Sequence, residues 1–427
     1  MNSHHASWID QAAQLDAEDA LASYREYFAF PQRDHRPVAY FCGNSLGLQP
    51  ARAETIVLEE LEDWRRFGVE GHFQSRRPWY SYHRWFAEPL ARLVGALPHE
   101  VVAMNTLTVN LHLMMTSFYR PTSERHAILC AGGEFPSDRY AIESQIRLHG
   151  LDPATSMIEL APREGASTLT TEDILEAIAA RGQETALVLF SGVHFYTGQF
   201  FDIAAITKAA HDAGAMAGFD LAHAIGNVEL SLHDWDADFA VWCSYKYLNG
   251  GPGAVAGLYV HERYADRADL PRLAGWWGND EATRFSMAHS FVPTHGADGW
   301  QLSNAQVLPL AVLMSSLEIF DRAGMDRISA KRDQLTGFLD RLLQEVIASR
   351  DWIRIITPSD AARRGAQLSV HFDRHGREIF EQLIAQGVIV DWRTPSVIRM
   401  APAPLYTSFA DVVRLATTLE TLLAAHQ

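Results

Sequence analysis

Short apolar runs alternate with amphipathic stretches through the middle of the chain. Between about residues 100 and 265, the runs at 127–131, 186–190, 215–219, 239–243 and 255–260 predict buried strands. Helical patterns lie between them, for example at 172–180 and 203–213. Strands that alternate with helices are typical of an α/β layer with a mostly parallel sheet. We therefore expect a ligand crevice at the carboxyl ends of these strands.

The two ends of the chain have a different pattern. A turn-rich segment, 42–47, precedes a helix predicted over 52–66, in which Val57, Leu61 and Trp64 share one face. After about residue 305 helices dominate, with short strands predicted at 367–372 and 388–390. Two apolar stripes mark these helices: Leu335, Phe338, Leu342 and Val346, and then Val412, Leu415, Leu419 and Leu422. This part of the chain predicts a smaller α+β domain.

Composition narrows the class of protein. With 427 residues, 48% of them hydrophobic, the chain can bury a large core in two or three packed units. The net charge of -16 disfavours nucleic acid as a partner. The longest apolar stretch, 307–320, contains Ser315, Ser316 and Glu318, which makes it too short and too polar for a membrane span. Residues 1–14 lack an apolar signal core, so we expect a cytoplasmic protein.

Cysteine and lysine are both rare. The three cysteines, Cys42, Cys130 and Cys243, are widely spaced, which predicts neither disulfides nor a metal site and fits a reducing compartment. Of the 36 lysines and arginines, the only lysines are Lys208, Lys246 and Lys331. Chemistry that needs a primary amine therefore has three candidates.

Lys246 is the strongest of these candidates. It follows the predicted strand 239–243 and precedes a glycine-rich turn. An isolated lysine in such a place is ordinarily a surface residue. However, we expect Lys208 and Lys331 to lie in exposed helical contexts, which leaves Lys246 as the amine best placed to form a Schiff base with pyridoxal phosphate.

Two further features suit the same cofactor, and each has an ordinary alternative. Asp220 directly follows the apolar run 215–219 and precedes His223. A buried aspartate needs a cationic partner, which the pyridinium of the cofactor supplies. Asp220 can instead cap a helix that begins at Ala222. The segment 105–112 opens a helical run whose free amides, with the Thr108 hydroxyl, attract phosphate. A plain capping role explains Thr108 equally well.

Several short segments, taken in order, closely resemble the kynureninase family. They extend from about residue 40 to 410 and comprise Gly-Asn-Ser-Leu-Gly-Leu-Gln-Pro at 43–50, Phe-Pro-Ser-Asp at 135–138, Phe-Asp-Leu-Ala-His-Ala-Ile-Gly-Asn at 219–227, Cys-Ser-Tyr-Lys-Tyr-Leu-Asn at 243–249, Gly-Trp-Trp-Gly at 275–278, Ser303-Asn304 and Arg-Met-Ala-Pro-Ala-Pro-Leu-Tyr at 399–406. Each piece is short, but the ordered set is specific.

The resemblance implies a fold and a division of the chain. The fold is the pyridoxal-phosphate-dependent transferase type, fold type I, with a mostly parallel central sheet and a smaller α+β domain. Residues 1–70 form an N-terminal arm and helix that contribute to the small domain, 71–304 the large cofactor-binding domain, and 305–427 the C-terminal small domain. The resemblance also implies a homodimer with active sites shared between the subunits.

The resemblance further assigns roles to individual residues. Lys246 forms the aldimine, Asp220 pairs with the pyridinium and Phe135 stacks on the ring. The other cofactor residues are Leu107, Thr108, Asp138, Ser191, His223, Tyr245, Trp276 and Asn304. Arg399 is expected to bind the substrate α-carboxylate with its bidentate guanidinium; without the resemblance, a structural arginine on a strand would be as good an interpretation. Ser45, His72 and Asn304 are expected near the aromatic ring of the substrate. No metal is implied.

The implied reaction is hydrolysis of L-kynurenine, 3-hydroxy-L-kynurenine or both to anthranilate or 3-hydroxyanthranilate and L-alanine. It belongs to tryptophan catabolism and NAD biosynthesis. Lys246 removes the α-proton, water adds to the γ-carbonyl, and the Cβ–Cγ bond breaks because the cofactor stabilises the β-carbanion. Tyr245 is either a proton relay or a phosphate ligand.

Two other functions remain to be weighed. A cysteine desulfurase on the same fold needs a nucleophilic cysteine on a mobile loop. Cys130 and Cys243 lie in predicted strands and should be inert. Cys42 remains a candidate, although we expect it to lie far from the C-terminal domain. An inactive binding protein on this scaffold would be expected to lose Lys246 or Asp220, and both are present.

Overall fold

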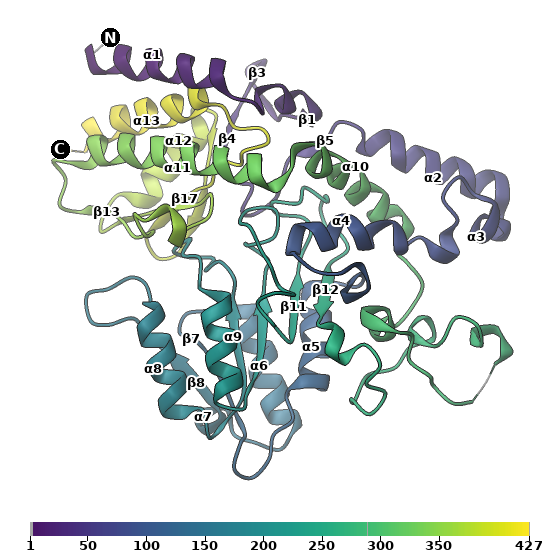
Figure 1. Cartoon of the computed structure of the whole chain (residues 1–427). Coiled ribbons are helices and arrows are strands. Elements are labelled where there is room, and N and C mark those ends of the chain that lie inside the picture. Colours follow the sequence, from purple (N-terminus) through teal and green to yellow (C-terminus); the bar gives the residue numbers. More distant parts are fainter. Residues whose placement is uncertain (1–2, 288, 427) are drawn as a thin grey trace.

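A seven-stranded sheet forms the centre of the larger part of the molecule (Figure 1). The computed structural model describes residues 3–287 and 289–426. The strand order is β6-β12-β11-β10-β9-β7-β8. Neighbours from β11 to β8 are parallel, whereas β12 is antiparallel to both of its neighbours, so the predicted mostly parallel sheet is confirmed. The strands are β6 (Val101–Ala103), β7 (Ala127–Ala131), β8 (Met157–Leu160), β9 (Thr185–Ser191), β10 (Met216–Asp220), β11 (Phe239–Trp242) and β12 (Gly257–Val260).

Alternate residues of each central strand enter two different cores, which explains the continuous apolar runs. On β9, Val188 and Phe190 belong to the core that includes helices α8 and α9, whereas Leu187 and Leu189 belong to the core that includes α5 and α6. The sheet is therefore covered on both faces. The helices of this part are α4 (Arg84–Val94), α5 (Leu107–Phe118), α6 (Pro136–Leu148), α7 (Pro153–Ser156), α8 (Thr171–Arg181), α9 (Ile203–Asp212) and α10 (Val307–Ala323).

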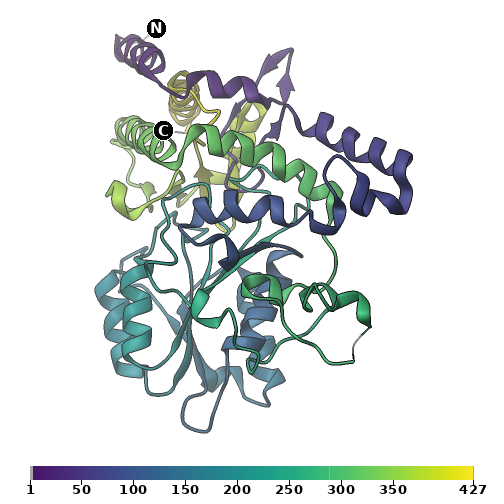
Figure 2. The same cartoon turned by 45° about the vertical axis from the view of Figure 1, so that its right-hand side comes forward.

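The smaller part contains a four-stranded antiparallel sheet in the order β13-β14-β17-β16. Both predicted apolar stripes are buried in its core, on α11 and α13. Helix α1 packs along α13, and β4 pairs with β15, so the two ends of the chain meet here (Figures 1 and 2). The elements are α1 (Ser3–Glu18), β4 (Ala39–Tyr40), α11 (Met325–Ile347), β13 (Ile353–Ile355), β14 (Leu368–Phe372), α12 (Gly376–Ala385), β15 (Val388–Ile389), β16 (Asp391–Arg393), β17 (Val397–Met400) and α13 (Phe409–Ala424).

The remaining elements connect these two parts. Helix α2 packs against α10, and none of the described helices has the length and apolar character that crossing a bilayer requires. Figures 1 and 2 show the segment around residues 270–300 extending outward from the large sheet. The connecting elements are β1 (Phe28–Ala29), β2 (Gln32–Arg33), β3 (Arg36–Pro37), β5 (Gln49–Pro50), α2 (Ala53–Phe67) and α3 (Gly71–Gln74).

Helix α2 forms where predicted, but with its predicted apolar face outward. Trp64 is 61% exposed and Leu61 is 38% exposed, whereas Glu60 is almost fully buried. The Glu60 carboxylate accepts hydrogen bonds from the Trp79 indole at 2.9 Å and the Tyr82 hydroxyl at 3.0 Å. The Arg77 guanidinium pairs with the same carboxylate, its Nε donating to Oε1 at 2.6 Å. These partners make burial of a charged residue possible, so the apolar stripe predicted the helix correctly but its buried face wrongly.

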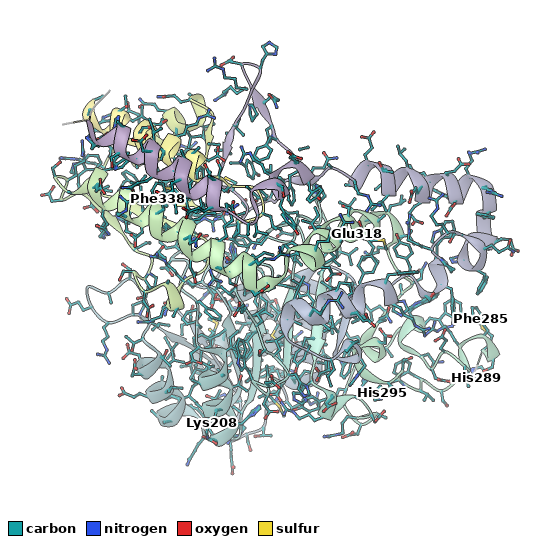
Figure 3. The ribbon with its side chains drawn as sticks, turned by 45° about the horizontal axis from the view of Figure 1, so that its top comes forward. Lys208, Phe285, His289, His295, Glu318 and Phe338 are labelled. Atoms are coloured by element: carbon teal, nitrogen blue, oxygen red, sulfur yellow. The ribbon has the colours of Figure 1, made fainter. Side chains whose placement is uncertain are left out.

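The expectation of two exposed helical lysines holds for only one of them. Lys208 projects from α9 at the edge of the molecule (Figure 3), where it pairs with Asp212. The side chain of Lys331 is instead buried, and its Nζ lies 2.6 Å from Oδ2 of Asp19, which is also buried. Burial lowers the pKa of Lys331, and the carboxylate of Asp19 opposes that effect.

The ion pair between Asp19 and Lys331 supplies a test of this packing. We expect Asp19→Asn to lower the free energy of unfolding by about 3–5 kcal/mol, because it leaves a buried ammonium without its counter-charge. Adding Lys331→Met should restore most of the loss. Urea unfolding of the two variants measures both effects; a double variant no more stable than Asp19→Asn would contradict this account.

Candidate active site

Three strand ends bring the predicted lysine and aspartate to one edge of the large sheet. Ser191, the last residue of β9, is the register partner of Asp220, the last residue of β10. Lys246 follows the end of β11, the next parallel strand. A cavity lies at this edge, and every predicted cofactor residue except Trp276 and Asn304 lines it. The lining residues are Leu107, Thr108, Glu134, Phe135, Ser137, Asp138, Ser191, Val193, Phe195, Asp220, Ala222, His223, Tyr245 and Lys246.

The Lys246 amine contacts the imidazole of His223. Its Nζ lies 3.0 Å from Nε2 of His223. Burial and then the charge of Lys246 lower the pKa of His223, so the neutral ring accepts a hydrogen bond from the amine. The ring proton then resides on Nδ1, which is buried and has no hydrogen-bond partner among the described residues. A buried donor of this kind fits an oxygen atom of a bound ligand.

Two carboxyl groups lie in the same cavity. Oδ1 of Asp220 accepts a hydrogen bond from the Ala222 amide at 2.6 Å, as in the capping alternative, although turns rather than a helix follow. Asp138 belongs to the first turn of α6. Burial and then the negative charge of Asp220 raise the pKa of Asp138, so Asp138 keeps its proton and can donate to Asp220. A pyridinium nitrogen would supply the missing positive charge beside Asp220.

The start of helix α5 supplies amides for a phosphate. Leu107 and Thr108 are its first two residues, and Thr106 before them makes no side-chain capping bond. The Thr108 hydroxyl lies 3.0 Å from that of Ser137. Unpaired amides and hydroxyls at a helix start bind phosphate well.

The ring of Phe135 offers a surface for stacking beside the amine. Phe135 is 40% exposed, and the Lys246 Nζ lies 5.9 Å from the centre of its ring. The neighbouring ring of Phe195 meets it edge-on. Together with the helix start, the unpaired imidazole donor and the carboxyl pair, this exposed ring makes the cavity a good fit for pyridoxal phosphate.

Arg399, on the smaller sheet, does not line this cavity but contacts a residue that does. The residue is fully buried on β17, and its Nε donates to Oδ2 of Asp391 at 2.6 Å. Its Nη1 donates to the backbone carbonyl of Phe195 at 2.7 Å, and Phe195 lines the cavity. Burial lowers the pKa of the guanidinium, whereas the carboxylate of Asp391 raises it.

Besides Arg399, four predicted site residues do not line the cavity within one chain. Trp276 is half exposed in a short 3-10 helix, Trp276–Gly278, where its indole donates to the carbonyl of Arg284 at 3.3 Å. Asn304 and His72 line a separate cavity beside Trp64 and Val69. Ser45 is half-buried in the turn-rich segment.

Glu134 is a cavity residue that the sequence interpretation missed. It is buried, and its Oε1 accepts hydrogen bonds from the amide of Ser191 at 3.2 Å and from its hydroxyl at 3.1 Å. Burial raises the pKa of Glu134 to about 7; the Ser191 amide opposes this rise and the charge of Asp220 reinforces it. The only signal in the sequence was a glutamate directly before the motif 135–138.

Curated proteins related over nearly the whole chain decide the family. The kynureninase of Myxococcus xanthus (strain DK1622) is 57% identical over 410 residues, which cover 96% of each chain. The kynureninase of Xanthomonas campestris pv. campestris (strain B100) is 54% identical over 97% of this chain and 98% of its own. The chain belongs to the kynureninase family. The family model for the kynureninase C-terminal domain also matches residues 328–419.

Solved structures of more distant proteins share the fold. The cysteine desulfurase CsdA from Escherichia coli has a TM-score of 0.75 at 17% identity and covers 95% of this chain and 98% of its own. The apo cysteine desulfurase from Thermococcus onnurineus NA1 has a TM-score of 0.73, also at 17% identity, and covers 91% of this chain and 95% of its own. At this identity the likeness shows the fold alone, which is the predicted fold type I.

The cysteines of this kynureninase-family chain do not suit desulfurase chemistry. Contrary to expectation, Cys42 lies against the C-terminal domain, since it forms a β-bridge with Ala401. Its thiol is buried, and burial followed by the charge of Asp391 raises its pKa to about 12. Burial also raises the pKa of Cys130 and Cys243. None of the three is an exposed thiolate on a loop.

The thiols should therefore react slowly in the native protein. A pKa of about 12 lowers the thiolate fraction of Cys42 at pH 8 about a thousandfold relative to an ordinary thiol. We expect iodoacetamide at pH 8 to modify none of the three cysteines within the time that labels all of them in urea. Mass spectrometry of the labelled peptides measures the extent of modification at each cysteine. Rapid labelling of Cys42 in the native protein would contradict this prediction and make Cys42 a candidate nucleophile again.

Proposed function

We propose that this chain hydrolyses L-kynurenine, 3-hydroxy-L-kynurenine or both to anthranilate or 3-hydroxyanthranilate and L-alanine. The observation that carries the proposal is the cavity in which Lys246, His223 and Asp220 meet. The chain that contains this cavity is 57% identical to a curated kynureninase over 96% of each chain. The cofactor is pyridoxal phosphate.

Each feature of the cavity has a role toward that cofactor. When bound, pyridoxal phosphate supplies an electron sink for negative charge on the carbons of the amino acid. Asp220 holds the pyridine nitrogen in its protonated form, and the start of α5 with Thr108 holds the phosphate. Phe135 lies against the ring. The Nδ1 proton of His223, which lacks a protein acceptor among the described residues, binds a cofactor oxygen.

Two side chains handle protons. Lys246 moves the proton at the α-carbon of the substrate, and the neutral imidazole of His223 orients its amine. Burial raises the pKa of Tyr245, so its phenol keeps a proton at neutral pH. That phenol donates either to the phosphate or to the carbon released when the Cβ–Cγ bond breaks.

Arg399 binds the substrate α-carboxylate in this scheme. A guanidinium has five N–H donors, and contacts with Asp391 and the Phe195 carbonyl use only part of them. Asp391 fixes the plane of the guanidinium, which lies behind Phe195, so its remaining donors are oriented before substrate arrives.

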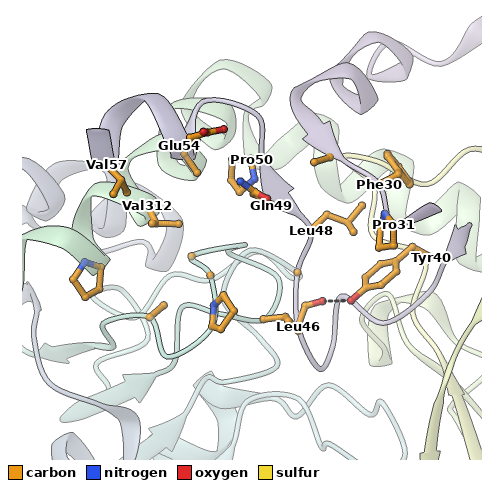
Figure 4. A pocket seen from close by; sticks show the side chains of 18 of the residues that line it. Phe30, Pro31, Tyr40, Leu46, Leu48, Gln49, Pro50, Glu54, Val57 and Val312 are labelled. Carbon is orange, nitrogen blue, oxygen red and sulfur yellow. Dashed lines mark hydrogen bonds between the residues drawn. The ribbon is translucent and has the colours of Figure 1, made fainter. Parts of the chain in front are cut away.

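We also propose a homodimer in which each subunit completes the active site of the other. The outward face of α2 carries Leu61 and Trp64, and large apolar side chains gathered on a surface typically mark an interface. Beside it lies a cavity of about 770 Å³ with mostly apolar walls, including Leu48, Val57 and Val312 (Figure 4). A second copy would cover this face.

The dimer also accounts for residues that lie far from their own cavity. Trp276 reaches the cofactor, and His72 and Asn304 reach the substrate ring, across the subunit boundary. Ser45 approaches the substrate ring from the same chain, because the amide of Gly47, two residues further on, donates to the carbonyl of Tyr245 at 2.8 Å. The division into an arm at 1–70, a large domain at 71–304 and a small domain at 305–427 belongs to the same proposal, supported by separate cores around the two sheets. A cytoplasmic location suits three free cysteines.

The proposed role of Lys246 can be tested by locating the covalently bound cofactor. Borohydride reduction followed by peptide mapping should place pyridoxal phosphate on Lys246, because Lys331 is buried against Asp19. Lys246→Ala should abolish hydrolysis of both substrates, assayed side by side, and Lys208→Ala, the matched control, should leave it unchanged. Cofactor found on Lys208 or Lys331 would overturn the assignment.

The shared site can be tested by mixing two inactive variants. Lys246→Ala and Asn304→Ala damage opposite halves of each shared site, so a mixed dimer retains one intact site. Random subunit exchange should then restore about a quarter of the wild-type activity, since half of the dimers are mixed and half of their sites are intact. Sedimentation before and after mixing measures the assembly. Activity that stays at the sum of the two parents after exchange, or a fully active monomer, would refute the shared site.

A further inference from the structure

Glu134 brings a third carboxyl group into a cavity that must accept a phosphate-bearing cofactor. It lines the same cavity as Asp138, Asp220 and Lys246, and its side chain is buried. Ser191 donates two hydrogen bonds to its carboxyl group. The roles proposed above for Lys246, Asp220 and His223 leave Glu134 without a function.

The contacts of Glu134 fix the end of strand β9. Its carboxyl receives both the amide and the hydroxyl of Ser191, the residue in register with Asp220. The amide of Gly192, the next residue, donates to the carbonyl of Asp220 at 2.7 Å. The Glu134 side chain therefore ties the segment before Phe135 to the end of β9, and the Gly192 amide ties that strand end to Asp220.

The groups around Glu134 offer little positive charge. Asp220 on β10 and Asp138 on α6 are acidic, and burial keeps the Cys130 thiol on β7 protonated. His194, whose ring meets the carbonyl of Gly133, is neutral because burial lowers its pKa to about 4. The amine of Lys246 also lines the cavity, and we propose above that it bonds to the cofactor. An ionised Glu134 would therefore repel an incoming phosphate.

We propose that Glu134 is a positioning residue that holds Ser191 for the cofactor and takes up a proton from solvent when the cofactor binds. The proposal rests on the cofactor site proposed above. The protonated carboxyl still accepts both hydrogen bonds from Ser191 through its carbonyl oxygen, so the strand end stays in place while one negative charge is removed.

The proton uptake gives binding a defined dependence on pH. Burial already raises the pKa of Glu134 to about 7, and nearby negative charge on the cofactor raises it further. A group whose pKa is higher in the complex favours binding while it is protonated in both states. The favourable contribution is lost as pH rises through about 7 and above.

The test is a titration of the full-length apoenzyme with pyridoxal phosphate between pH 6 and pH 9, followed by absorbance. Glu134→Gln keeps the hydrogen-bond acceptor and removes the titration. It should bind pyridoxal phosphate about tenfold more tightly than wild type at pH 9 and about equally at pH 6. Glu134→Ala loses the acceptor and should bind more weakly than Glu134→Gln at every pH. Glu176→Gln, the same change on an exposed face of α8, is the matched control and should follow wild type.

Each outcome separates the inference from the proposal beneath it. Wild-type protein that fails to bind pyridoxal phosphate would overturn the proposed site. Normal binding with the same pH profile in wild type and Glu134→Gln would overturn the role of Glu134 alone, as would equal binding by the Ala and Gln variants.

A second variant covers the case in which neither change at Glu134 folds. Ser191→Ala removes one hydrogen bond that stabilises the ionised carboxylate, so the pH midpoint of binding should move upward. An unchanged midpoint would overturn the inference.

Discussion

The parallel pairing of β9, β10 and β11 is the constraint on which the rest of this molecule depends. Because parallel strands point the same way, their carboxyl ends lie at the same edge of the sheet. Polar residues that follow these strands therefore come close together in space even though they are far apart in the sequence. Helix α9 separates Ser191 from Asp220, and a turn-rich segment at 221–238 precedes the strand that leads to Lys246, yet all three residues line one cavity. Because both faces of these strands are buried, the residues within them are apolar. Polar catalytic and binding residues can therefore lie only at the strand ends.

The fold was predictable to the extent that local pattern determines it. The strands β7, β9, β10, β11 and β12 and the helices α8 and α9 stand close to their predicted positions, because their apolar runs are long and bounded by turns. Strand β6 is only three residues long, and β8 carries Glu159 within four residues, so neither gives a run that stands out. Lys246, Asp220 and Thr108 could be selected from their chemistry, whereas the roles of His223 and of the stacking residue Phe135 came from resemblance to a family.

What could not be predicted depends on partners distant in the sequence. Glu60 is buried because Arg77 pairs with it and Trp79 and Tyr82 donate to it. Lys331 is buried because Asp19 reaches it from the N-terminal arm. The bridge between Cys42 and Ala401 joins opposite ends of the chain. The local sequence pattern around Glu60, Lys331 or Cys42 does not predict these contacts. The roles that we propose for Trp276 and Asn304 would depend on a second chain, which the pattern of a single chain does not predict.

The scarcity of lysine has a practical consequence for handling the protein. Lys331 is locked in its ion pair, and Lys246 stands inside the cavity against His223. The side chain of Lys208, on the outer surface of α9, is 75% exposed. Among the lysines, an amine-reactive dye or resin would therefore attach through Lys208, at a site outside the cavity. Single-molecule or surface-immobilised measurements could use this chemistry without engineering an attachment site, because the fold itself leaves one lysine side chain open to the reagent.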